Sequence, residues 1–174
     1  VHSALIQGLY RYRSDLPDFH VFDGSPSPFL TFSRATCISA DGSRIGGWTR
    51  DPSLPSFASY WDTSDLSLHT TGYYGDRWEG ASVLAFSADG SVAVGFRGYD
   101  PVLQTLGAFH WTIGEPFAAP LPPSGNNVVA HAVSADGQVT VGHVNNQAVI
   151  WNGLAEAIYF LPEITSEARA ITPD

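Results

Sequence analysis

The sequence predicts an all-β fold built from repeated units of four short antiparallel strands. Three observations support this prediction. The phrase Ser-Ala-Asp-Gly occurs three times, short stretches alternate between apolar and polar residues, and 17 glycines and 12 prolines interrupt the chain too often for long helices. The aspartates of the phrase, Asp41, Asp89 and Asp136, are 48 and 47 residues apart, a spacing typical of repeat proteins.

The first expected strand of each unit runs into the Asp-Gly pair and ends in a small residue, an apolar residue and a hydroxyl, as in 37–39, 85–87, 132–134 and 170–172. Asp-Gly between two strands is a strong hairpin signal, because the glycine supplies a positive φ and the aspartate accepts backbone hydrogen bonds. Calcium needs six to eight oxygens, and each loop offers one carboxylate. We therefore interpret these pairs as structural turns: Asp41-Gly42, Asp89-Gly90 and Asp136-Gly137.

The second expected strand alternates, most clearly in 92–96 and 139–143, and contains a glycine six residues after the aspartate: Gly47, Gly95 or Gly142. A glycine there indicates a bulge or the close approach of another backbone. The third strand contains a repeated tryptophan (61, 111 and 151), which we expect to pack between units. The fourth is short and prolines mark it as an edge, as in 118–122 and 158–162.

The two ends of the chain together match one further unit. Residues 3–8 match a second strand, and residues 168–174 match a first strand. We predict a single domain, a β-propeller-like ring of four four-stranded antiparallel blades, closed by pairing of the N- and C-terminal strands. Its units are 168–174 with 1–31, 32–79, 80–123 and 124–167. An open array or a fragment of a larger ring are the alternatives.

The units resemble the HAF-type extracellular repeats of bacteria, which run A-x-A-[VI]-S-A-D-G-S-x-x-V-G and then A-F-x-W. Residues 130–142 and 107–112 carry the resemblance, and Phe22 stands where the first unit would have its tryptophan. The turn alone is also similar to those of WD-repeat and TolB-type propellers. The resemblance implies export and a propeller-like fold, and it implies no reaction.

Composition narrows the possible partners. The net charge is −9, and all eight basic residues are arginines scattered along the chain. Nucleic acid and anionic membrane surfaces require clustered cations, so we expect neither. No apolar stretch is long enough for a transmembrane helix. The single cysteine excludes an internal disulfide, which fits a reducing compartment or a bacterial exported protein without disulfides. Position 1 is not methionine, so we expect a processed or excised segment of a longer chain. The family resemblance implies export, to the periplasm, the cell surface or the medium.

No constellation of residues predicts catalysis, a metal or a cofactor. The six histidines form no HxH or HExxH motif, although we expect His110 and His131 in matched strands of neighbouring units, facing a shared space. Cys37 stands where other units have alanine, which is typical of a small core residue. The densest carboxylates (62, 65, 76 and 79) fit a solvated loop.

Two loops that do not repeat, 71–79 and 97–101, are rich in the residue types used at binding surfaces. The expected interaction residues are Tyr73, Tyr74, Arg77, Trp78, Arg97 and Tyr99. We therefore expect a non-catalytic module that binds a protein partner, such as an accessory structural subunit. A carbohydrate-binding module is the first alternative. An enzyme that acts on polysaccharide through carboxylates at one mouth of the ring is the second.

Overall fold

The computed structural model describes residues 9–11, 20–22, 32–50, 56–71, 80–100, 105–125, 127–155, 158–159 and 166–172. Within these ranges the regular structure is entirely β-strand, which confirms the predicted all-β class. The same ranges contain no helix long and apolar enough to span a membrane.

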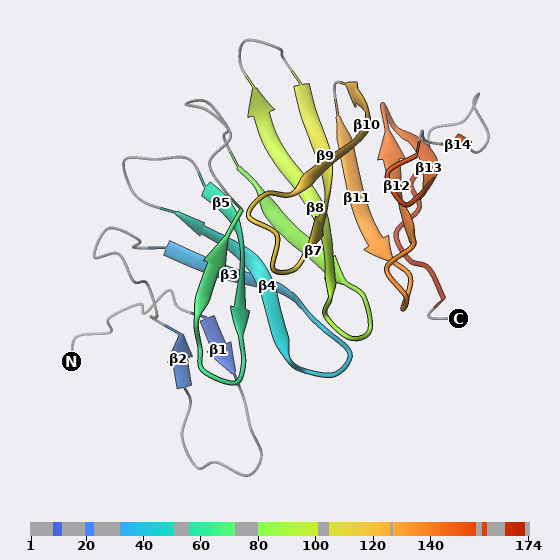
Figure 1. Cartoon of the computed structure of the whole chain (residues 1–174). Coiled ribbons are helices and arrows are strands. Elements are labelled where there is room, and N and C mark those ends of the chain that lie inside the picture. Colours follow the sequence, from blue (N-terminus) through green and yellow to red (C-terminus); the bar gives the residue numbers. More distant parts are fainter. Residues whose placement is uncertain are drawn as a thin grey trace.

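Three four-stranded antiparallel sheets make up most of the described chain, and each follows the chain order, as predicted (Figure 1). The first sheet consists of β3 (Phe32–Ile38), β4 (Arg44–Arg50), β5 (Ser56–Asp62) and β6 (Leu68–Thr70). The second consists of β7 (Ser82–Phe86), β8 (Val92–Asp100), β9 (Thr105–Thr112) and β10 (Ala119–Gly125). The third consists of β11 (Val128–Val133), β12 (Val139–Val144), β13 (Gln147–Asn152) and β14 (Ile158–Tyr159).

The structure does not show the predicted fourth blade or the closing strand pair. In the described residues, β1 (Leu9–Arg11) pairs with β2 (His20–Phe22) in a separate two-stranded sheet. Residues 166–172 form no strand, and their intended partner, 3–8, lies outside the described ranges. The N–H of Ala168 donates to the carbonyl of Gly142 (3.2 Å), so this segment lies against the third sheet.

The sheets pack face to face through two apolar clusters. Between the first and second sheets lie Tyr60, Val83 and Phe109, with Trp111. Between the second and third lie residues such as Val94, Leu121, Val144 and Trp151. The three repeated tryptophans are 1%, 3% and 0% exposed, and burying each stabilises the fold by a few kcal/mol. Trp111 and Trp151 lie in the clusters between sheets, as predicted, whereas Trp61 forms a cluster with Ile45 and Leu68 of its own sheet. The indole N–H of Trp151 also reaches the second sheet, where it donates to the carbonyl of Pro122 (2.5 Å).

The glycines of the second strands confirm the expectation of close backbone approach. A Cβ atom built on Gly47, Gly95 or Gly142 would overlap a carbonyl oxygen of the adjacent first strand. Beside each glycine the first strand contains a bulge, because its register shifts by one residue at Thr36, Leu84 and His131. A bulge redirects the extra side chain, so these three residues occupy a special position of each unit.

Candidate functional site

The repeated Ser-x-Asp-Gly turns are built alike in all three sheets. In the second sheet, the Ser87 hydroxyl donates to Asp89 Oδ1 (2.8 Å) and accepts from the N–H of Val92 (2.9 Å), while the N–H of Ser91 donates to the same carboxylate (2.9 Å). Equivalent bonds join Ser39, Asp41, Ser43 and Arg44, and Ser134, Asp136, Gln138 and Val139. The turn glycines have φ of 71°, 69° and 76°. The contacts of these polar residues are therefore those of turns.

The turns also join the sheets to one another. The N–H of Asp41 donates to the carbonyl of Ala88 (3.2 Å), and the N–H of Ala88 donates to that of Ala135 (3.1 Å). Hydrogen bonds from the N–H of Ser91 and from the hydroxyls of Ser91 and Ser87 lower the pKa of Asp89 to about 2. The carboxylate is thus ionised at any neutral pH, which suits its role as an acceptor.

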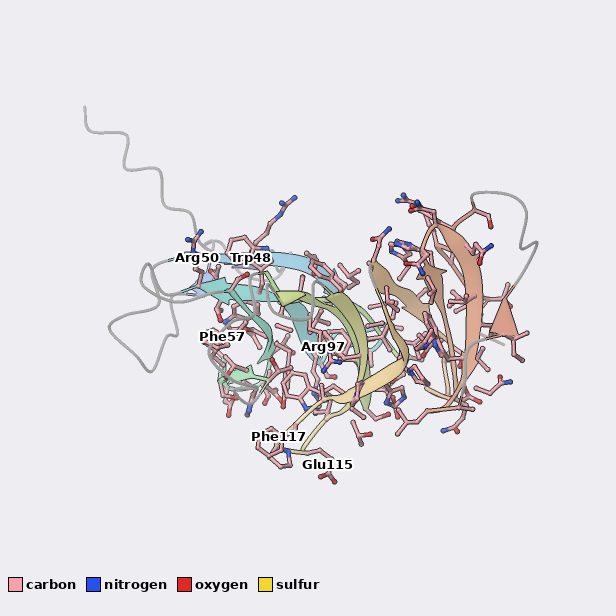
Figure 2. All side chains as sticks on the ribbon, turned by 90° about the horizontal axis from the view of Figure 1, so that it is seen from above. Trp48, Arg50, Phe57, Arg97, Glu115 and Phe117 are labelled. Carbon is pink, nitrogen blue, oxygen red and sulfur yellow. The ribbon has the colours of Figure 1, made fainter. Side chains whose placement is uncertain are left out.

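Of the expected interaction residues, the structure describes two. Arg97 and Tyr99 lie in β8, so the predicted loop 97–101 is wrong: the strand runs to Asp100. The half-buried Arg97 side chain lies over Gly107 of β9, where the missing side chain leaves room. Figure 2 shows Arg97 toward the middle of the molecule, whereas Glu115 and Phe117 lie at its margin. Tyr73, Tyr74, Arg77 and Trp78 lie outside the described residues.

A cluster of ionisable side chains that the sequence did not predict lies on the third sheet. It comprises His131 at the bulge of β11, His143 in β12 and Glu167 in the C-terminal segment; we call it the His–Glu cluster. His131 Nε2 and His143 Nδ1 are 3.1 Å apart, and His143 Nδ1 is 4.0 Å from Glu167 Oε1. Each residue offers one donor atom, and the three atoms lie within 4.8 Å of one another.

The surrounding chain positions Glu167 and His143. The N–H groups of both neighbours of Glu167 bond to the third sheet: Ala168 donates to Gly142, and Ser166 donates to the carbonyl of Asn146 (2.8 Å). The Ser166 hydroxyl accepts from the N–H of Ala148 (3.1 Å). Beyond the histidine pair, His143 Nε2 lies 3.3 Å from Asn127 Oδ1.

Burial favours the neutral form of both histidines. Burial lowers the pKa of His143, and burial together with the neighbouring His143 lowers the pKa of His131. The pKa of Glu167 is also lowered, because Arg169 Nη2 contacts its carboxylate at 2.5 Å. The cluster therefore combines two imidazoles whose pKa values are lowered with one carboxylate, and the Glu167 side chain is 34% exposed.

The expectation that His110 and His131 lie in matched strands is wrong. His110 lies in β9, a third strand, and its Nε2 contacts the carbonyl of Gly137 (3.2 Å), whereas His131 lies in β11, a first strand, and faces His143. One sequence signal pointed to the cluster: His143 directly follows the repeated Gly142, where the other units have Trp48 and Phe96.

Comparisons with known proteins concern the fold. No family model matches the chain, and no curated protein matches it. TolB from Acinetobacter baumannii has 14% sequence identity and a TM-score of 0.56, with 87% of this chain and 36% of TolB covered. A prolyl endopeptidase has 12% identity and a TM-score of 0.56, with 94% of this chain and 26% of that chain covered.

At this level of identity the likeness shows the fold alone. The protein is all-β, and its packed antiparallel sheets resemble the propeller domains of these structures. The chain spans about a third of TolB and about a quarter of the endopeptidase.

Proposed function

We propose that the protein is a non-catalytic interaction or scaffold module that binds a protein partner. One observation carries the proposal: the repeated polar residues are engaged in turns, and the repeated tryptophans are engaged in packing. Large exposed apolar side chains, in contrast, differ from unit to unit, and Phe117 and Leu154 are 52% and 54% exposed. Exposed apolar side chains that differ between otherwise similar units are suited to recognition of another protein.

The fourth blade and the closed ring belong to the same proposal. Phe86 and Val133 pack against the preceding sheet, whereas Ile38, at the equivalent place in β3, is 60% exposed. The first sheet therefore has a face fit for a further blade, and the third sheet already holds 166–172 against β12. We assign the ring-closing blade to 168–174 with 1–31. Fluorophores at the two ends should show efficient energy transfer, and its absence would contradict ring closure.

Export and membership of the HAF-type repeats are proposals based on the resemblance of residues 130–142 and 107–112 to that repeat. The aromatic segment that includes Tyr73, Tyr74, Arg77 and Trp78 is the first contact surface to test, and Arg97 and Tyr99 of β8 are the second. Fractionation of the native cells would locate the protein, and recovery in the cytosolic fraction would contradict export.

The direct test is gentle isolation from the native source, followed by size-exclusion chromatography and mass spectrometry. We expect a partner protein at fixed stoichiometry that rebinds after purification and is lost in Trp78→Ala. His69→Gln, a change in an exposed residue of β6, is the matched control. A protein that elutes alone would contradict the proposal, as would binding to glycan or hydrolysis of polysaccharide in the same preparation.

A further inference from the structure

We propose that the His–Glu cluster is a binding site for a divalent transition-metal ion of the zinc class. The inference is independent of the interaction function. Zinc bonds of about 2.0–2.2 Å in a tetrahedron place neighbouring donor atoms about 3.3–3.5 Å apart. The two imidazole nitrogens, at 3.1 Å, already lie near this separation. Glu167, at the surface, would move inward by about 1 Å to complete the set.

The orientation of His143 supports the proposal. Its Nε2 faces Asn127 Oδ1, and the Asn127 amide in turn donates to Asn146 Oδ1 (2.9 Å). A hydrogen on Nε2 leaves the lone pair of Nδ1 directed at His131 and Glu167. Metal-binding histidines are commonly held by a hydrogen bond from their other ring nitrogen, and this bond fixes the tautomer.

The donor types select the metal. Two imidazoles and one carboxylate suit zinc and related ions, whereas calcium and magnesium prefer sites built entirely from oxygen. Three protein donors leave one position of a zinc tetrahedron for water or for an exogenous donor. Arg169 is a competing cation that contacts Glu167, and its side chain is 75% exposed, so a metal ion that binds the carboxylate would displace it toward solvent.

The other sheets provide natural counterparts without such donors. When the units are aligned on their Asp-Gly turns, His131 corresponds to Thr36 and Leu84, and His143 corresponds to Trp48 and Phe96. Glu167 corresponds to Ser82 and Val129. The second sheet therefore tolerates leucine and phenylalanine at the histidine positions, so the double variant His131→Leu/His143→Phe is expected to fold.

The experiment is calorimetric titration of the apo-protein with zinc chloride, together with the visible spectrum of the cobalt-loaded protein. We expect one zinc per chain, with a Kd of about 1 μM or lower, and tetrahedral cobalt absorption near the intensity typical of nitrogen and oxygen donors. The double variant should lose about 100-fold or more in affinity, and Glu167→Gln should lose about tenfold or more. His69→Gln should bind like the original protein.

Circular dichroism establishes that each variant is folded, and Glu167→Gln changes a surface residue that the sheets do not need. The proposal is overturned if the original protein binds no zinc. It is also overturned if the folded double variant retains the affinity, or if calcium or magnesium binds in preference to zinc.

Discussion

The Ser-x-Asp-Gly turns and the His–Glu cluster use polar side chains in different ways. In the turns, each hydroxyl and carboxylate bonds to its own hairpin, with Ser87, Asp89 and Val92 joined by bonds of 2.8–2.9 Å. In the cluster, the donor atoms come from three separate segments and face one another. The turns recur in three sheets, whereas the described residues contain one such cluster.

This difference teaches where function is to be sought in a repeat protein. A residue that recurs in every unit does what every unit needs, which is to fold and to pack on its neighbour. The bulge of the first strand is likewise shared, but its residue differs: Thr36 donates to the carbonyls of Gly46 and Val83, and His131 meets His143. The bulge thus places a side chain that stabilises the fold in one unit and a side chain that can bind a ligand in another.

The largest expected effect is on the shared framework. Gly95→Ala should destabilise the fold by about 3 kcal/mol or more, because the new Cβ would overlap the carbonyl of Ser82, which belongs to a paired strand and cannot move away. Gly42→Ala is the matched control, since it has open space and costs only the left-handed φ, about 1 kcal/mol. Denaturant unfolding measures both. Equal losses would show that backbone approach is not what the repeated glycine provides.

A smaller effect is expected on the stability of the protein at low pH. The pKa of Asp89 is about 2 in the folded protein, below the ordinary value of about 3.9. The stabilisation from its charge is therefore fully present above about pH 5 and is lost as the pH falls toward 2. Asp89→Asn should lower Tm by a few degrees at pH 6 and by progressively less toward pH 2.5. A difference that does not change with pH would contradict this role of the charge.

The smallest expected effect is a change in the zinc affinity of the His–Glu cluster. Arg169→Gln should raise the zinc affinity about two- to fivefold, because the substitution removes a positive charge whose Nη2 lies 2.5 Å from the carboxylate of Glu167. Added salt should reduce the difference. Calorimetry at two ionic strengths checks this, and a weaker affinity in the variant would mean that Arg169 instead holds Glu167 in place.

The sequence predicted the sheets well because the features that build them recur in it. Asp-Gly pairs, glycines of the second strand and the tryptophans at 61, 111 and 151 each produce the expected turn, close contact or buried side chain. The ends were predicted less well. Residues 168–172 have the pattern of a first strand, but a strand is defined by its pairing as well as by its pattern, and the described contact is one bond from Ala168 to β12.

The complete His–Glu cluster could not be predicted from local pattern, although His143 stands where the other units have Trp48 and Phe96. His131 reaches His143 because the register of β11 shifts at the bulge, and alternation along the sequence does not reveal a bulge. Glu167 joins them only because the C-terminal segment packs on the third sheet. Tertiary packing, rather than spacing in the sequence, creates the site.

One paired measurement tests most directly whether repeated residues maintain the fold while unit-specific residues bind. Tm and zinc affinity are measured for Ser87→Ala and for His131→Leu/His143→Phe. Ser87→Ala leaves the N–H of Val92 without its hydroxyl acceptor in a buried turn, so it should lose about 1–3 kcal/mol of stability and keep its zinc affinity. The double variant should keep its Tm and lose zinc. Parallel losses of stability and affinity in both variants would contradict this division.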